Sequence, residues 1–412
     1  MSFRASQVGK LWESISKYGL RDGSQQALLR WLRTQVGFTA DVLGDYSYVL
    51  TEDAPPTLRA SSAKELTIAW LIPEVGPGVG GLFNIFRAIH QLEQWGHRHR
   101  IYVVGDSATD AESMTNVARR DYFPITSAIE IFNGKVADSD ALVASSWQTA
   151  YAARALSNTA RKFYFVQDLE YLFYAPGSIA ELARETYRWG FHGITGGQWI
   201  ADVLNSEFKM NSSAFGFSYD RHVYSPAGKR TFPDGKKRIL FYARPITPRR
   251  GFELGVLALS EIAKQLPETE FVFVGASDRG MKLPFPTVSP GILSPMELAA
   301  LYRSCTAALI LSFTNLSLLP LEVMACGCPV VSNRGANVEW LLNEDTTQLA
   351  APTPEALAAA ILEVLQNDRL RTLKTEAGLR FAERTDWGKE IKAIEAGFYR
   401  GLAECAVEQQ HV

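Results

Sequence analysis

The chain has 412 residues, of which 47% are hydrophobic and 21% are charged. Because a single hydrophobic core rarely grows beyond about 250–300 residues, this length favours two domains, and the composition is that of an ordinary globular protein. The formal net charge of -2 lacks the basic excess that is typical of general nucleic-acid binders.

The cysteines and the apolar runs indicate in which cellular compartment the protein is found. The four cysteines, at positions 305, 326, 328 and 405, are few and irregularly spaced, which argues against a disulfide framework and favours a reducing compartment. Cys326 and Cys328 flank one glycine, which is too close for a usual zinc pair. No apolar run approaches the roughly 18–20 residues that span a bilayer, and the charged N-terminus lacks a signal-peptide core. We therefore expect a cytoplasmic protein.

Residues 1–64 are expected to form an N-terminal helical extension. Residues 1–37 hold six basic and two acidic side chains, a local balance of six minus two, or +4. Apolar residues recur there at helical spacing, for example Leu11, Ile15 and Tyr18. Two interpretations stay open: a helix packed on the main body, or a basic amphipathic surface that touches the inner face of the cytoplasmic membrane.

From residue 66 onward, short apolar runs alternate with helix-like stretches. The first series of strands is expected at 66–72, 101–105, 141–146, 163–168, 193–197 and 215–218, with helices at 82–95, 147–156 and 179–190. After a linker at 224–238, a second series is expected, with strands at 239–243, 271–276, 307–312 and 329–333, and helices at 252–265, 296–304, 320–326 and from Thr353-Pro354-Glu355 onward. Such alternation builds parallel sheets covered by helices on both faces.

The sequence therefore predicts an α/β protein with two Rossmann-like, doubly wound domains that face a central cleft. The first domain is expected at 65–227 and the second at 228–385. Residues 386–412 are expected to form a C-terminal helix that packs back on the N-terminal domain.

Functional residues are expected directly after the strands, because parallel α/β sheets bind ligands at the carboxyl ends of their strands. The first candidate is the glycine-rich segment 73–81, before the helix at 82–95, where Gly80 and Gly81 let a phosphate approach backbone N–H groups. A structural turn is the alternative. The second is Arg244 and Arg250, two cations on one loop that are able to straddle a diphosphate.

The third candidate is Glu322, within residues 319–331 (LPLEVMACGCPVV). It lies in the first turn of a short helix, where the helix dipole stabilises an acid whatever its function. A carboxylate at a strand end also accepts hydrogen bonds from sugar hydroxyls.

Together these segments resemble the retaining glycosyltransferases of family 4, which have the GT-B fold, over roughly residues 66–400. The resemblance implies that Glu322 binds the nucleotide ribose, that Arg244 and Arg250 bind the diphosphate, and that Gly80 and Gly81 offer loop amides. Further donor contacts are expected from Thr314, Asn315, Leu318, Leu319 and Ile292. One departure stands out: the family's second glutamate, eight residues before Glu322, is Thr314 here, which suits a deoxy sugar.

Residues 165–170 (FVQDLE), 173–178 (FYAPGS) and 194–199 (ITGGQW), together with 145–150 (SSWQTA), resemble the WsaF-type rhamnosyltransferases of bacterial surface polysaccharides. This resemblance implies dTDP-rhamnose as the donor and a glycan or lipid-linked glycan as the acceptor. Gln167 and Asp168, at the end of the strand 163–168, are interpreted as catalytic positioning groups. A cap or turn role is the alternative for Asp168.

No acidic cluster is spaced to hold a divalent metal beside the diphosphate, so the reaction is expected to need no metal or other cofactor. Two other function classes stay open. One is a nucleotide-sugar epimerase of the same fold, which would need carboxylates as acid and base around the sugar. The other is a non-catalytic subunit of glycan assembly. The sequence predicts no oligomeric state.

Overall fold

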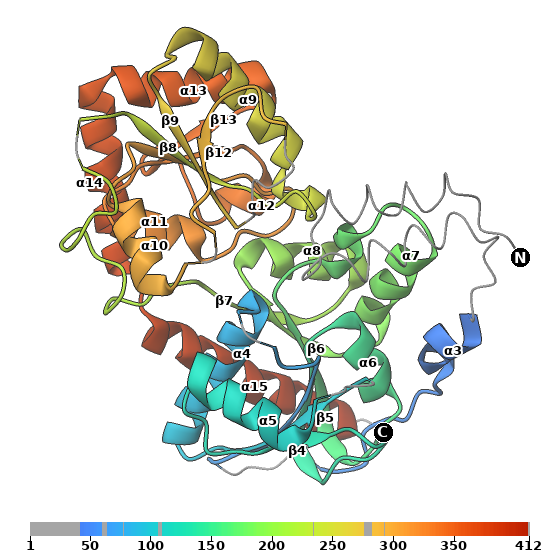
Figure 1. Ribbon diagram of the computed structural model, residues 1–412. Coiled ribbons are helices and arrows are strands. Elements are labelled where there is room, and N and C mark those ends of the chain that lie inside the picture. The colour runs from blue at the N-terminus through green and yellow to red at the C-terminus, as the bar shows by residue number, and fades with distance from the viewer. Residues whose placement is uncertain are drawn as a thin grey trace, which may run out of the picture.

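The computed structural model describes residues 42–59, 64–76, 78–105, 109–233, 235–275, 282–291 and 293–410, with side chains as far as residue 404. The basic segment 1–37 that was considered for membrane contact lies outside these residues. The described part of the chain forms two α/β bodies, each built around a sheet of parallel strands (Figure 1). The expectation of two doubly wound α/β domains is confirmed.

The first sheet has seven strands in the order β3-β2-β1-β4-β5-β6-β7. The strands are β1 (Thr67–Ile72), β2 (Arg98–Val103), β3 (Ile129–Ile131), β4 (Ser139–Ala144), β5 (Thr159–Val166), β6 (His192–Gly196) and β7 (Ser212–Phe215). The helices that connect them are α4 (Gly80–Gln94), α5 (Ala111–Val117), α6 (Trp147–Arg154), α7 (Ser178–Glu185) and α8 (Gln198–Phe208).

The second sheet has six strands in the order β10-β9-β8-β11-β12-β13. The strands are β8 (Arg238–Tyr242), β9 (Glu270–Val274), β10 (Thr287–Val288), β11 (Ala307–Leu309), β12 (Val330–Asn333) and β13 (Thr347–Ala350). The helices are α9 (Phe252–Gln265), α10 (Pro295–Tyr302), α11 (Leu319–Ala325), α12 (Ala336–Glu339), α13 (Pro354–Gln366) and α14 (Asp368–Arg384).

The expected strands occur within a few residues of their predicted positions, with one shift. β7 is Ser212–Phe215 rather than 215–218, because the polar residues before Phe215 pair with β6. Three strands were not predicted, namely β3, β10 and β13. Each has only two to four residues, so none forms an apolar run long enough to be recognised.

The last helix, α15 (Trp387–Gln410), returns from the second body to the first and covers β5 and β7 (Figure 1). Phe398 packs edge-on against Trp70 of β1 and Phe163 of β5, with ring centroids 6.1 and 5.1 Å apart. Gly401 permits this close approach, because a Cβ there would stand 2.5 Å from the Phe163 ring. Helix α15 therefore completes the hydrophobic core on one face of the first sheet.

A short segment precedes the first sheet. It consists of α3 (Val42–Tyr46) and a 3-10 turn, Ser47–Leu50. Tyr48 packs against Trp147 and Tyr151 of α6, with ring centroids 6.1 and 5.9 Å apart. This segment is thereby fixed on the first body by aromatic contacts.

Candidate active site at the domain interface

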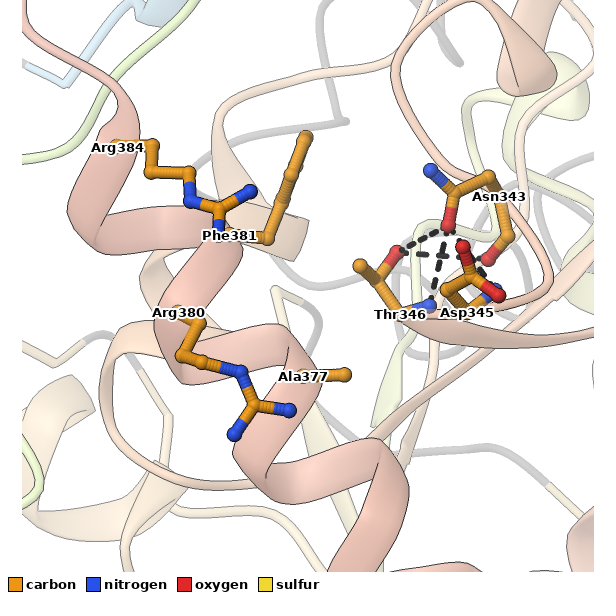
Figure 2. A pocket seen from close by; sticks show the side chains of 7 residues that line it. All are labelled: Asn343, Asp345, Thr346, Ala377, Arg380, Phe381 and Arg384. Carbon is orange, nitrogen blue, oxygen red and sulfur yellow. Dashed lines mark hydrogen bonds between the residues drawn. The ribbon is translucent and has the colours of Figure 1, made fainter.

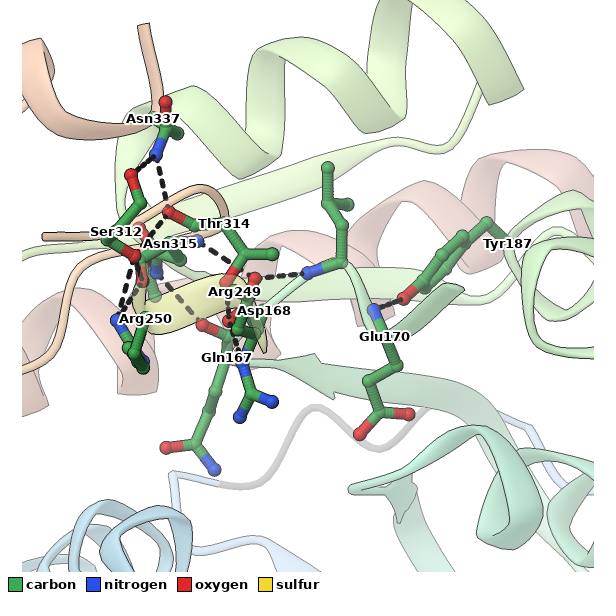
Figure 3. A network of polar contacts seen from close by, with 12 residues as sticks. Gln167, Asp168, Glu170, Tyr187, Arg249, Arg250, Ser312, Thr314, Asn315 and Asn337 are labelled. Atoms are coloured by element: carbon green, nitrogen blue, oxygen red, sulfur yellow. Dashed lines mark hydrogen bonds and ion pairs between the residues drawn. The ribbon is translucent and has the colours of Figure 1, made fainter. Parts of the chain in front are cut away.

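The candidate residues come together where the carboxyl ends of the two sheets face each other. Loops that follow β5 and β6 of the first sheet meet loops that follow β8, β11 and β12 of the second. In both sheets the strand order reverses beside the first strand, which is where doubly wound sheets bind ligands. Figure 3 shows the network of polar contacts that joins these loops.

Asp168 is the centre of this network. Its Oδ2 accepts a hydrogen bond from the Thr314 hydroxyl at 2.7 Å, and its Oδ1 accepts from the Asn315 amide at 2.9 Å (Figure 3). Oδ1 also accepts from the Leu169 amide at 2.9 Å, so Asp168 does fix its local turn. Burial raises the pKa of Asp168, while the hydrogen bonds from Asn315 and Thr314 and the nearby arginines oppose the rise. A carboxylate of the first domain is therefore held by donors of the second.

Asn315 extends the contact between the domains. Its Nδ2 donates to the carbonyl oxygens of Gln167 and Gly196, at 2.9 and 2.6 Å. Its Oδ1 accepts from the Trp340 indole N–H at 2.9 Å. Both Nδ2 and Oδ1 of Asn315 therefore have hydrogen-bond partners. Thr314 and Asn315 are each only 1% exposed. Thr314 and Asn315, which are expected to contact the donor sugar, are thus buried against the first domain.

Trp340 of the second domain packs its ring against two residues of the first domain. Its centroid lies 5.3 Å from that of Phe217, at an interplanar angle of 72°. Gly197, which has φ +108°, also lies close to the ring, because a Cβ there would stand 2.7 Å from Trp340. The indole is held in place by the Asn315 side chain described above.

Gln167 connects the β5 loop to the glycine-rich segment. Its Oε1 accepts from Asn84 Nδ2 at 2.8 Å, and its Nε2 donates to the Gly81 carbonyl at 3.0 Å. Gly80 and Gly81 are the first residues of α4. Space over Gly80 is open, since an added Cβ would meet no heavy atom within 4 Å, whereas one at Gly81 would stand 3.3 Å from Gln167. Their role as phosphate donors stays a prediction.

Three arginines follow β8, and they differ in environment. Arg250 Nη1 donates to Ser312 Oγ at 2.7 Å and to the Asn315 carbonyl at 3.1 Å. Arg244 is exposed and donates to the Gly275 carbonyl at 3.3 Å. Arg249, which was not predicted, has its Nε 3.9 Å from Asp168 Oδ2. The sequence signal for Arg249 was only its place beside Arg250.

Glu322 lies in the first turn of α11 and is half-buried. Burial raises the pKa of this carboxyl to about 7, although a hydrogen bond from Tyr224 and the charge of Arg87 favour the ionised form. Arg87 comes from α4 of the first domain, where its guanidinium lies over the Phe123 and Trp387 rings. The two domains thus meet at Glu322 as well, and its ribose-binding role stays a prediction.

The remaining predicted donor contacts are apolar. Leu318 and Leu319 lie at the start of α11, and Leu319 is buried. Ile292 lies outside the described residues. The structure therefore neither groups these three around a ligand nor separates them from one.

Glu170 is a half-buried residue that the sequence analysis did not select. Its Oε2 accepts from the Trp147 amide at 2.5 Å and from the Tyr164 hydroxyl at 3.1 Å, while its own amide donates to the Tyr187 hydroxyl (Figure 3). Burial raises the pKa of Glu170 to about 7. Because its carboxylate stabilises the N-terminus of α6, the contacts in the structure give it a structural task.

A pocket of about 240 Å³ lies elsewhere, between α14 and the turn before β13 (Figure 2). Arg380 and Arg384 of α14 line one side, and Asp345 and Thr346 line the other (Figure 2). The turn precedes β13, so this pocket is at the amino end of the second sheet. It is on the opposite edge from the candidate site.

Three other properties bear on the predictions. Among the described residues, no three His, Cys, Asp or Glu side chains are grouped so as to hold a metal ion. Within the same residues, no helix has both the length and the apolar character of a membrane span. Cys305, Cys326 and Cys328 are free and buried, and the side chain of Cys405 lies outside the described part.

The comparison with protein families finds a similarity for the second body. Residues 237–362 match the model of the WsaF C-terminal domain. This segment is similar to the C-terminal domain of WsaF. It contains the arginine loop after β8, the Thr314-Asn315 loop and Glu322.

A relative extends the similarity to most of the chain. The O-antigen biosynthesis protein RfbC of Myxococcus xanthus is 31% identical over 368 residues, which are 84% of this chain and 28% of RfbC. The chain thus spans less than a third of the length of that relative.

Solved structures show the fold. Sucrose-phosphate synthase of Thermosynechococcus elongatus superposes with a TM-score of 0.63 at 15% identity, covering 82% of this chain and 99% of that one. HepE of Anabaena, solved with UDP and glucose, superposes with a TM-score of 0.60 at 15% identity, covering 82% of this chain and 100% of that one. The chain has the GT-B fold, and its resemblance to WsaF-type glycosyltransferases is confirmed.

Proposed function

We propose that this chain is a glycosyltransferase of bacterial surface-polysaccharide synthesis, which transfers a sugar from a nucleotide diphosphate donor to a glycan acceptor. The observation that carries the proposal is the site itself. An arginine-rich loop of the WsaF-type domain and a carboxylate of the other domain meet at the carboxyl ends of both sheets. The similarity to RfbC, an O-antigen biosynthesis protein, supports the biological setting.

The chemistry that these residues support is a displacement at the sugar's anomeric carbon. The bond from that carbon to the diphosphate breaks, and a bond to an acceptor hydroxyl oxygen forms. In the retaining mechanism that we propose, the hydroxyl proton passes to an oxygen of the leaving phosphate. Arg244 and Arg250 are proposed to stabilise the charge on the leaving group, which makes a metal ion unnecessary.

Asp168 and Gln167 fit a positioning role better than a nucleophilic one. Both carboxylate oxygens of Asp168 already accept hydrogen bonds from Thr314 and Asn315. Gln167 is fixed by Asn84 and Gly81. Groups that are held in place by hydrogen bonds orient reactants at low entropic cost.

For the donor we propose dTDP-rhamnose. Thr314, which stands where the family has a glutamate, supports this donor. A buried glutamate whose sugar lacked the matching hydroxyl would stay desolvated and without a donor, at a cost of about 1–3 kcal/mol. Leu318 and Leu319, four and five residues after Thr314 in the chain, are proposed to contact the methyl group of this 6-deoxy sugar.

A donor panel tests the proposal. Thermal shifts with dTDP, UDP and GDP identify the base, since a ligand that binds only the folded state raises the melting temperature. Nucleotide release is then followed with each nucleotide-sugar and a rhamnose-terminated acceptor. We expect dTDP to bind more tightly than GDP and dTDP-rhamnose to be productive. Transfer from a UDP- or GDP-hexose alone would overturn the rhamnose assignment and leave the glycosyltransferase intact.

A second function stays in view because one solved structure is a putative UDP-N-acetylglucosamine 2-epimerase of Listeria monocytogenes. It superposes with a TM-score of 0.55 at 12% identity, covering 83% of this chain and 98% of that one. Epimerisation would produce an altered nucleotide-sugar without any acceptor. The same panel, run without acceptor and followed by chromatography of the nucleotide-sugars, separates the two reactions.

A further inference from the structure

The pocket between α14 and the turn before β13 is polar on both walls (Figure 2). On one wall, α14 presents Arg380, Phe381 and Arg384, which lie on one face of the helix because they are one to four residues apart. On the other wall, the turn presents Asn343 and Asp345. The volume of about 240 Å³ is below the roughly 300–1,000 Å³ of pockets for drug-sized ligands, so the pocket suits a ligand of about one sugar ring.

Hydrogen bonds fix the two walls relative to each other. Lys374 of α14 is buried, and its Nζ donates to the Glu344 carbonyl and, at 3.1 Å, to the Thr347 carbonyl. Asn343 Oδ1 accepts from the Asp345 amide at 3.0 Å, which holds the turn itself in shape. The pocket is therefore preformed, and a ligand that enters it has little of the protein to order.

The charges around the pocket leave one cation without a partner. Arg380 is paired with Glu376 on the same helix, at 3.6 Å. Burial lowers the pKa of Lys374, and the charge of Asp345 opposes this shift, so Asp345 lies close to a cation as well. Within the described part of the chain, the Arg384 guanidinium has neither a hydrogen bond nor an ion pair. The pocket thus has one uncompensated positive charge, which favours an anionic ligand.

The side chains around the pocket also indicate what else the ligand carries. The guanidinium groups of Arg380 and Arg384 have only donors, and they fit a carboxylate or a phosphate. The Asp345 carboxylate has only acceptors, so it repels a bare anion but accepts hydrogen bonds from hydroxyl groups. Phe381 adds an apolar surface between the two arginines. A sugar ring with one acidic group and several free hydroxyls satisfies both walls.

We propose that this pocket binds an acidic saccharide, with its carboxylate or phosphate on Arg384 and Arg380 and its hydroxyls on Asp345. The pocket lies at the amino end of the second sheet, whereas the candidate active site lies at the carboxyl ends of both sheets. A saccharide bound here is therefore not the reacting sugar. It is a second point at which the protein holds a glycan.

Isothermal titration of the full chain with glucuronate, glucose 1-phosphate, glucose and inorganic phosphate tests this. We expect both acidic sugars to bind more tightly than glucose or phosphate. Arg384→Gln should weaken the acidic sugars by about 10- to 100-fold, the range for one lost charge-assisted contact. Arg369→Gln is the matched control, because Arg369 is an exposed arginine of α14 that does not line the pocket, and its affinities should equal those of the wild type.

Asp345→Ala tests the hydroxyl contact. The substitution removes the repulsion of every anion alike, but it removes a hydrogen-bond acceptor only from ligands that have hydroxyls. The preference for acidic sugars over inorganic phosphate should therefore fall in this variant, whatever the change in overall affinity. An unchanged preference would overturn the saccharide assignment and leave a site for simple anions.

The remaining outcomes decide whether this pocket is the site. Melting temperatures first establish that each variant is folded. If Arg384→Gln bound the acidic sugars as well as Arg369→Gln does, or if the wild type bound neither acidic sugar at millimolar concentrations, the proposal would be wrong. Binding of dTDP should be the same in the wild type and in Arg384→Gln. The proposal and the proposed function can therefore fail separately.

Discussion

Replacing Gly197 by alanine should loosen the contact between the two domains. Gly197 has φ +108° and ψ 152°, a backbone conformation that essentially only glycine adopts. An added Cβ would also stand 2.7 Å from two ring atoms of Trp340, which no real Cβ tolerates. The substitution therefore has two costs, one local to the first domain and one shared between the domains.

The two costs have separate magnitudes and separate readouts. The strained dihedral costs about 1–3 kcal/mol and should lower the stability of the whole first domain. The clash with Trp340 costs about 1–3 kcal/mol and is relieved when the domains part, so it favours opening. Because the Asn315 amide donates to Asp168 across the interface, its hydrogen exchange reports that opening. We expect its exchange to accelerate by about 5- to 150-fold.

Hydrogen exchange of peptides that contain Asn315 is the assay. Gly196→Ala is the matched control, since a Cβ at Gly196 would meet the Phe217 ring at an ordinary 3.4 Å. In a Trp340→Ala background, adding Gly197→Ala should change Asn315 exchange no further, because the clashing ring is gone. If Gly197→Ala and Gly196→Ala gave the same Asn315 exchange, Trp340 would not be the element that couples Gly197 to the interface.

Three further predictions concern the donor site. Glu322→Ala should weaken nucleotide binding by about 10- to 100-fold in titrations. Because burial raises the pKa of Glu322 to about 7, the carboxyl becomes a full acceptor only as pH rises through that value, so wild-type affinity should increase from about pH 6 to 8 and the Glu322→Gln profile should be flat. Turnover should persist in EDTA, since arginines are assigned the neutralising role. Loss of turnover that Mg²⁺ or Mn²⁺ restores would contradict the arginine roles as well.

The elements that build the two sheets could be predicted because their signals are local. Runs such as 66–72 are apolar enough to be recognised as buried strands, and Thr353-Pro354 begins α13 as its cap chemistry requires, with Thr353 accepting from the Ala356 amide. The placing of functional residues after strands follows from the same topology. Asp168 and Gln167 were selected on this basis, and they do lie where the sheets meet.

What the sequence could not predict is the pairing between residues far apart along the chain. Thr314 and Asp168 are 146 residues apart, and no periodicity or spacing relates them. Trp340 carries no motif, and its importance arises from the glycine and the ring of Phe217 that it meets in the other domain. Arg249 was overlooked for a similar reason, because the Phe173 ring that orients it comes from the first domain.

These contacts also constrain how a donor is bound. Thr314, Asn315 and Asp168 already satisfy one another, so a sugar that bonds to any of them must replace an existing hydrogen bond. Such exchanges contribute little net free energy, because bonds are broken as others form. The favourable free energy therefore has to come from other contacts, and the arginines after β8 are proposed to supply it through the diphosphate. We therefore expect most of the donor affinity to depend on the diphosphate, and the neutral contacts around Thr314 to distinguish one sugar from another.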